Sequence, residues 1–179
     1  MEANEIINFW FSEISPQQWW QKDEQFDELI KNRFSDIHFS AHQGELFEWR
    51  ETASGRLAEV IILDQFSRNM FRDKPQAFAS DPLALGLAQE AVSLGVDKEL
   101  SQIQRSFLYM PYMHSESKVI HEEAVKLFKA NGNQSNYEFE IKHKVIIDRF
   151  GRYPHRNDIL GRDSTNEELV FLKEPGSSF

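Results

Sequence analysis

Two short segments of this sequence concentrate arginine, a side chain suited to binding carboxylates and phosphates. Residues 68–72 contain two arginines and residues 149–162 contain four, which is more than half of the arginines in the chain. A guanidinium group presents several N–H donors in one plane, which matches the paired oxygens of an anion. Because the chain carries a net charge of −9, this concentration of cations predicts a site for a small anionic ligand. The alternative is structural, since basic residues also pair with acidic neighbours and suit the C-terminal ends of helices.

A third segment, Tyr109–Glu116, combines tyrosine, histidine and glutamate at an expected junction between two helices. His114 and Glu116 flank the predicted start of the second helix, where free amide groups favour anions. A histidine in such a place can exchange protons with a ligand, so we predict a general acid or base. The candidates for this role are His114, Glu116 and His155. The alternative interpretation is a capping Ser115 beside a hydrogen-bonded histidine.

Together these segments define the predicted ligand-binding residues. They are Arg68, Asn69, Arg72, Tyr109, Tyr112, His114, Arg149, Arg152, His155 and Arg156. Two aspartates, Asp64 and Asp148, each follow two branched apolar residues, so we expect both to be at least half buried and paired with an arginine. We further expect one cleft to be lined by Arg68, Arg72, Arg152, Arg156, His114 and His155. Since two aspartates neutralise at most two guanidinium groups, converging arginines would leave surplus positive charge for an anion.

Other kinds of chemistry have little support in the sequence. Glu140 and His143 reproduce the Glu-x-x-His spacing of di-iron sites, but that chemistry needs two such motifs and further glutamates, and only one motif is present. The chain has no cysteine, and the fingerprints of serine nucleophiles, P-loops and dinucleotide sites are absent. We therefore expect no metal and no cofactor.

The two arginine segments also resemble each other, which indicates an internal duplication. Ile62–Arg72 and Ile146–Arg156 share two apolar residues, an aspartate, a phenylalanine, a small residue and two arginines in the same order. The offset is 148 − 64 = 84 residues, and it also relates Asp81, the expected N-cap of one helix, to Thr165 at the start of another. We predict that the two copies lie close together and are related by an approximate two-fold axis.

Helical periodicity dominates the elements that must position these residues. Apolar residues recur at three- and four-residue steps, as in Phe26, Leu29, Ile30, Phe34 and Ile37, and hairpin signals are nearly absent. Proline, glycine and capping residues divide the sequence into about eight helices. Since no linker or low-complexity run separates them, we predict one all-α domain over residues 1–179, in which the helices form a compact stack.

Composition and charge narrow the functional classes. The hydrophobic share of 40% provides material for a core, and no apolar run approaches the roughly 20 residues of a membrane span. The N-terminal residues are acidic where a secretion signal would be basic, which predicts a cytoplasmic protein without membrane contact. A net charge of −9 and the lack of a contiguous basic stripe argue against nucleic acid as a partner.

The three motif segments carry a family resemblance. Leu63–Arg72, Phe107–Glu116 and Arg149–Asn157 together resemble the bacterial Domain of Unknown Function 924 family, and the similarity extends to Pro175–Phe179 at the end of the chain. The resemblance implies a compact all-helical fold of tetratricopeptide-like type, and it supplies no activity. Ser67 stands where the family pattern more often has proline. The residue at which the helix of the first arginine segment ends is therefore not determined by the resemblance.

Two functions remain open. The first is a site for a small anionic molecule between the two arginine segments, with Tyr109–Glu116 as its wall. The second is an interaction module that presents a helical groove to a partner peptide, with Trp19, Trp20 and Trp49 as anchors. Because tryptophans of an all-α domain usually lie in the core, the exposure of these three side chains discriminates between the two functions.

Overall fold

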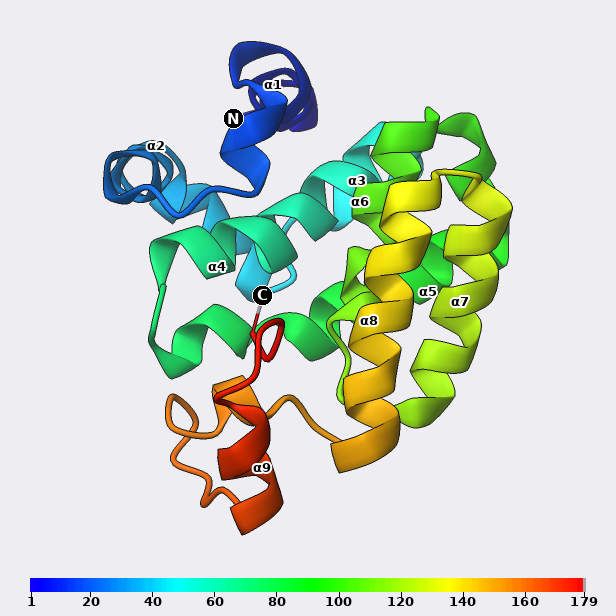
Figure 1. The fold of residues 1–179 in the computed structure, drawn as a ribbon. Helices are drawn as coiled ribbons and strands as arrows, with labels where there is room; N and C mark the ends of the chain where they lie inside the picture. Colours follow the sequence, from blue (N-terminus) through cyan, green and yellow to red (C-terminus); the bar gives the residue numbers. More distant parts are fainter. Residues whose placement is uncertain (179) are drawn as a thin grey trace.

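Every regular element of the computed structural model, which describes residues 1–178, is helical (Figure 1). The α-helices are α1 (Ala3–Asn8), α2 (Glu24–His42), α3 (Ala53–Ile61), α4 (Ser67–Met70), α5 (Asp81–Leu94), α6 (Gln102–Met113), α7 (Lys118–Asn131), α8 (Gln134–Phe150) and α9 (Asn166–Phe171). Short π-helical and 3-10 turns connect several of them. The prediction of an all-α protein is confirmed. Within residues 1–178, no helix combines the length and the apolar character that a bilayer span requires.

Residues 53–70 form one continuous helical rod with a change of pitch in its middle. Helix α3 passes into a π-helical turn at Ile62–Phe66 and then into α4. Ser67 does not end the rod. Its hydroxyl donates to the Leu63 carbonyl at 2.6 Å and lies 2.8 Å from Nε2 of His38. Single π-helical turns are frequent at functional sites, and this one contains Asp64.

The apolar core is divided into two unequal parts. The larger part is built from α1 to α7 and includes Trp10, Phe34, Phe66 and Phe107. The smaller part joins Ile146 and Ile147 of α8 to Tyr153 and to Phe171 of α9. In Figure 1 the segment 151–165 and α9 lie below the main stack of helices. The polar residues described below connect this C-terminal part to the rest of the molecule.

The two arginine segments take different local structures. In the first segment the helix continues through Arg68 to Met70. In the second, α8 ends at Phe150 because Gly151 adopts a left-handed conformation with φ of 71°, so Arg152 lies beyond the helix. The following helices also start out of step, because α5 has Ser80 as its N-cap, not Asp81, whereas α9 has Thr165. The sequence match is therefore not accompanied by matching backbone, and a duplication stays a prediction.

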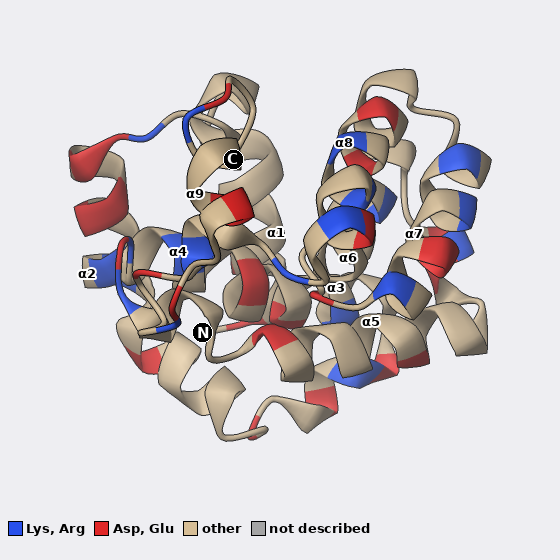
Figure 2. Cartoon of the chain, turned by 60° about the horizontal axis from the view of Figure 1, so that its bottom comes forward, with Lys and Arg blue, Asp and Glu red and all other residues tan. Residues whose placement is uncertain are grey.

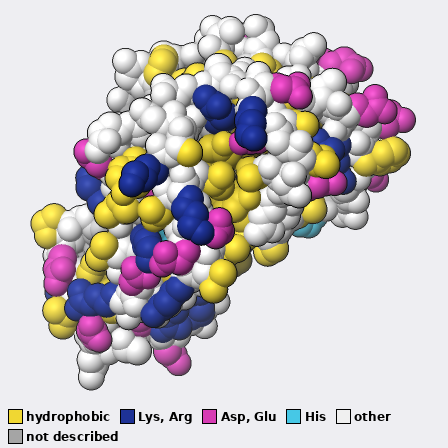
Figure 3. Space-filling view, turned by 90° about the vertical axis from the view of Figure 1, so that its right-hand side faces the viewer, with side chains coloured by type: hydrophobic (Ala, Val, Ile, Leu, Met, Phe, Trp, Pro, Cys, Tyr) yellow, Lys and Arg dark blue, Asp and Glu magenta, His cyan; other side chains and the backbone are white. Residues whose placement is uncertain are grey.

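Charged residues of both signs are spread over the surface. In Figure 2, Lys and Arg are interspersed with Asp and Glu along α7 and α8. The lower end of the face seen in Figure 3, which is the end formed by α9 and the segment before it, likewise shows basic side chains next to acidic ones. Most of the arginines there form ion pairs.

Candidate functional site

Asp64 is the centre of a buried polar cluster. Its carboxylate has 1% of its surface exposed and lies in the π-helical turn between α3 and α4. Oδ1 contacts Nη1 of Arg68 at 3.1 Å and Nδ1 of His114 at 2.7 Å, and Oδ2 accepts a hydrogen bond from Gln65 at 2.5 Å. Burial alone would raise the pKa of Asp64, but Arg68 and His114 outweigh it and hold the pKa well below its usual range. The carboxylate is therefore ionised, and the prediction of a buried Asp64 paired with an arginine is confirmed.

His114 pairs with this carboxylate through one ring nitrogen only. It follows the last residue of α6, and 16% of its side chain is exposed. Burial and the nearby Arg68 lower the pKa of His114, although Asp64 opposes this shift, so the ring is neutral at pH 7. Because the ionised Asp64 can only accept, the proton of the neutral ring resides on Nδ1. Nε2 then carries a lone pair, and no residue within 1–178 forms a hydrogen bond with it.

Arg68 is fully engaged with two carboxylates. It donates to both oxygens of Asp81, at 2.9 and 3.0 Å, and to the backbone carbonyl of Asp64 at 2.8 Å. Asp81 is the first residue of α5, so this bidentate pair joins the rod α3–α4 to the start of α5. These bonds account for the position of Arg68 without any ligand.

Arg156 lies in the same cluster but lacks such bonds. Its side chain is 8% exposed and lies over the rings of Phe78 and Tyr153, at 4.6 and 4.5 Å from their centres. The nearest approach to Asp81 spans 3.5 Å, and Nε has no hydrogen-bond partner within residues 1–178. Burial and the neighbouring Arg68 lower the pKa of Arg156, which means that its surroundings stabilise the charge poorly.

Glu116 fixes the C-terminal segment to the junction between α6 and α7. Its carboxylate accepts from the backbone N–H of Tyr153 at 2.7 Å and from Arg162 at 2.6 and 2.9 Å. Burial would raise the pKa of Glu116, but these donors lower it. Of the three predicted acid–base candidates, Glu116 is therefore occupied in positioning the chain. His155 is held nearby, and burial and Arg156 lower its pKa to about 4.

Comparison with known proteins places these residues in a family. Residues 6–176 match the family described as bacterial protein of unknown function (DUF924). The chain belongs to the DUF924 family. Its fold is similar to the structure of the protein of unknown function ATU0120 from Agrobacterium tumefaciens, with 40% sequence identity, a TM-score of 0.91 and coverage of 96% of each chain. No curated protein matches the sequence.

Several of the predicted ligand-binding residues of this DUF924 protein lie outside the Asp64 cluster and bind other carboxylates. Arg72 and Asn69 both donate to Asp27 of α2, with distances between 2.5 and 2.8 Å. Tyr109 donates to Asp97 at 2.5 Å, and Tyr112 is buried near the same carboxylate. Burial and that acidic neighbour raise the pKa of Tyr112 to about 12. The predicted set is thus divided, and the members that meet are Arg68, His114, His155 and Arg156.

The prediction for Asp148 is wrong with respect to its partner. The carboxylate lies on the outer side of α8, is 47% exposed and pairs with Lys144 at 2.8 Å, one helical turn earlier. Arg149 instead pairs with Glu167 at the surface, and Arg152 binds Glu168. The same local sequence therefore produces a buried aspartate in the first segment and a surface aspartate in the second.

Arg152 serves as a structural partner of Glu168. Two hydrogen bonds of 2.7 and 2.8 Å join the pair, and they are the main reason why the pKa of Glu168 falls to about 2. Since Glu168 is 3% exposed and loses two side-chain donors in the variant, we expect Arg152→Ala to lower the free energy of unfolding. Urea denaturation at pH 7 measures this change. A variant as stable as the wild type would contradict the role assigned to the pair.

The residues that sequence reasoning missed are partners of the arginines. Asp81 was expected only as a helix cap, yet it binds Arg68 and faces Arg156. Phe78 and Tyr153 provide the rings beneath Arg156. The only signal for Asp81 was an acidic residue at a helix start.

Glu140 of the single Glu-x-x-His motif is buried and pairs with His121 at 2.7 Å.

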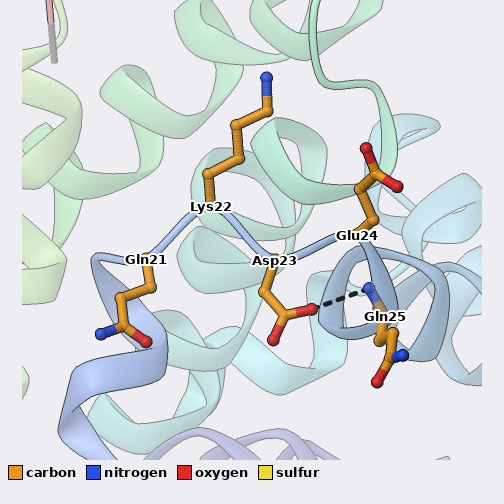
Figure 4. Close-up of a pocket in the computed structure, with 5 residues that line it drawn as sticks. All are labelled: Gln21, Lys22, Asp23, Glu24 and Gln25. Atoms are coloured by element: carbon orange, nitrogen blue, oxygen red, sulfur yellow. Dashed lines mark hydrogen bonds between the residues drawn. The ribbon is translucent and has the colours of Figure 1, made fainter.

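A surface hollow lies at a different place, along Gln21–Gln25 (Figure 4). Its side chains point in different directions, and Lys22 pairs with the exposed Asp73 at 3.2 Å. Asp23 accepts a hydrogen bond from the backbone of Gln25 as the N-cap of α2. The residues of this hollow are thus exposed or engaged in helix capping, and they do not form a second candidate site.

Proposed function

We propose that this protein binds a small molecule with a carboxylate or phosphate group at the cluster formed by Arg68, His114 and Arg156. The observation that carries the proposal is the state of Arg156. A guanidinium group that is almost completely buried has no hydrogen-bond partner for Nε within residues 1–178 and only a 3.5 Å ion pair to Asp81. Leaving a buried charged donor unsatisfied costs about 1–3 kcal/mol or more. An anion that accepts two parallel hydrogen bonds from this group would remove that cost.

The source of the attraction differs from the one expected from sequence. Asp64 and Asp81 together balance the charges of Arg68 and Arg156, so the cluster has no surplus of positive charge. What remains available is hydrogen-bonding capacity of two kinds: Arg156 has an unpartnered donor, and Nε2 of His114 has an acceptor lone pair. Without surplus charge, the site attracts distant anions weakly. It would therefore select a ligand by the positions of the ligand's hydrogen-bonding groups.

Thermal stabilisation by anions tests this proposal. We expect inorganic phosphate or succinate to raise the Tm of the wild type, since a ligand at 100 times its Kd adds about 2.7 kcal/mol of stability. Arg156→Gln should abolish the shift because it removes the unpaired guanidinium. The matched control is Arg149→Gln, which removes the same charge from a surface pair with Glu167 and should keep the shift. Equal shifts in both variants, or none in the wild type with either anion, would refute the proposal.

The alternative of a peptide-binding groove has less support from the tryptophans. Trp19 and Trp49 pack against the core, and Nε1 of Trp19 donates to the Trp10 carbonyl at 2.9 Å. Trp20 is 59% exposed and stacks on Phe107 at 5.9 Å. One exposed tryptophan is a weak anchor set for a groove. Tetratricopeptide-like stacking and a cytoplasmic location stay predictions, and the anion proposal requires neither.

A further inference from the structure

We propose that this site is catalytic and that His114 is a general base, which activates water to hydrolyse a small carboxylic ester bearing a second, anionic group. The inference rests on the proposed function, because the anionic group is the part of the substrate that Arg156 would hold. It goes beyond binding by assigning a proton-transfer role to one atom, Nε2 of His114. Three features of the cluster support this role.

The first feature is the orientation of the imidazole ring. Asp64 holds Nδ1 at 2.7 Å, and the same carboxylate is fixed by Arg68 and Gln65. A carboxylate that binds the protonated nitrogen of a histidine keeps the opposite nitrogen unprotonated and aimed away. It also stabilises the imidazolium ion that forms when Nε2 accepts a proton. Asp64 is therefore a positioning residue for the base.

The second feature is what Nε2 can act on. Within residues 1–178, no hydroxyl group forms a hydrogen bond with Nε2 of His114, and the chain has no cysteine. The dyad therefore has no protein nucleophile to activate. The proton that it accepts comes from water or from the ligand, and water is the nucleophile that is always present.

The third feature is the series of contacts that joins the base to the anion-binding group. A single oxygen of Asp64 contacts both His114, at 2.7 Å, and Arg68, at 3.1 Å. Arg68 and Arg156 in turn share Asp81. Arg68 and its two carboxylates thus link His114 to Arg156 through direct contacts.

These features define a balanced reaction. Nε2 of His114 takes a proton from water as the water oxygen forms a bond to the ester carbonyl carbon. The carbon–oxygen bond to the alcohol then breaks, and its electron pair stays on the leaving oxygen. That oxygen receives the proton from Nε2, so the ester and one water yield a carboxylic acid and an alcohol. The base ends in its starting state.

The test compares two esters that differ in charge. The probes are 4-nitrophenyl succinate, which keeps a free carboxylate, and 4-nitrophenyl acetate, which does not. We expect the wild type to hydrolyse the succinate ester with a kcat/KM at least 10-fold above that of the acetate. His114→Asn retains a donor for Asp64 but has no base, and we expect kcat to fall on the order of 10²–10⁴-fold. Arg149→Gln should match the wild type, and thermal melts verify that each variant is folded.

The role of Asp64 has its own readout. In the wild type, ¹⁵N spectra of the His114 ring should show the proton on Nδ1 at pH 7. In Asp64→Asn the side-chain amide can donate to Nδ1, so the proton should move to Nε2 and kcat should fall to the level of His114→Asn. A purely structural Asp64 would not change the tautomer.

The pH profile gives a further check on the base. The charged and titratable groups near His114 are Asp64, Arg68, Asp81 and His143. Because burial and Arg68 lower the pKa of His114 below 6.5, kcat should be constant above pH 7 and fall only at lower pH, where Nε2 becomes protonated. Activity that falls as pH rises from 6 to 8 would contradict a general base.

The outcomes separate this inference from the proposed function. If succinate raises Tm but the succinate ester shows no His114-dependent hydrolysis, the catalytic inference is overturned and the binding site stands. If neither phosphate nor succinate binds and no hydrolysis occurs, both are overturned. Equal hydrolysis by wild type and His114→Asn also overturns the catalytic role.

Discussion

Between pH 7 and pH 5 the free energy of unfolding should fall by at least about 5 kcal/mol, because the fold holds three largely buried histidines neutral in addition to His114. Burial lowers the pKa of His38 to about 4, of His143 to about 3 and of His155 to about 4. In the unfolded chain each of these rings titrates near 6.5. Acidification therefore adds protons to the unfolded state first. Each histidine contributes about 1.8 kcal/mol to the loss over this interval.

The direction of this pH dependence is opposite to that produced by a histidine in a stabilising ion pair. A histidine whose pKa is raised on folding would stabilise the protein at low pH, whereas these three destabilise it there. Urea denaturation of the ligand-free protein between pH 5 and pH 7 measures the slope. His38→Gln loses a hydrogen bond to Ser67 and should be less stable at every pH, but its loss of stability between pH 7 and pH 5 should be smaller by about 1.8 kcal/mol. An unchanged slope in this variant would show that His38 is not held neutral.

The pattern of helices in this chain was predictable from its sequence, whereas the environment of each motif residue was not. Helical periodicity and the ending of a helix at a glycine depend on local chemistry, and both are found in the structure, the second at Gly151. Asp64 and Asp148 have the same local sequence but different surroundings. The first lies in a rod that passes through the core, and the second lies on the outer side of α8. Spacing along the chain does not contain this information.

The candidate site was predictable in part for the same reason. The sequence predicted Arg68, His114 and Arg156 as ligand-binding residues, and the three lie in one cluster in the structure. It did not reveal that Arg72 and Arg152 each have a carboxylate partner of their own, because Asp27 and Glu168 approach them only after the helices pack. An arginine count therefore overestimates the number of cations available to a ligand. Among the four arginines that were expected to line the cleft, only the observed hydrogen bonds identify Arg156 as the one with an unpartnered donor.

Arg68→Met and Arg156→Met should change stability in opposite directions, although both remove a mostly buried arginine from the same cluster. Arg68 binds Asp81 with two hydrogen bonds and contacts Asp64 at 3.1 Å. Its removal leaves Asp64, which is 1% exposed, without its main cationic partner. Removing one partner of a buried ion pair typically costs about 3–5 kcal/mol. We expect Arg68→Met to lose about 3 kcal/mol, because His114 can gain a proton and compensate in part.

Arg156→Met should instead raise the free energy of unfolding of the ligand-free protein by about 1–2 kcal/mol. Asp81 keeps its two bonds to Arg68 in this variant, so no carboxylate loses its main partner. The methionine side chain can lie over the rings of Phe78 and Tyr153, where the guanidinium lies now. The buried charge and its unsatisfied Nε disappear with the substitution.

Urea denaturation of the two variants, with and without 50 mM phosphate, separates a binding residue from a structural one. A stabilised Arg156→Met that no longer responds to phosphate is the pattern of a group retained for its ligand, since such residues lower the stability of the empty protein. A loss of about 3 kcal/mol or more in Arg156→Met would contradict this and would assign Arg156 the same structural role as Arg68. Because both variants have the same side chain in the same cluster, only the partners of the lost arginine can account for a difference in sign.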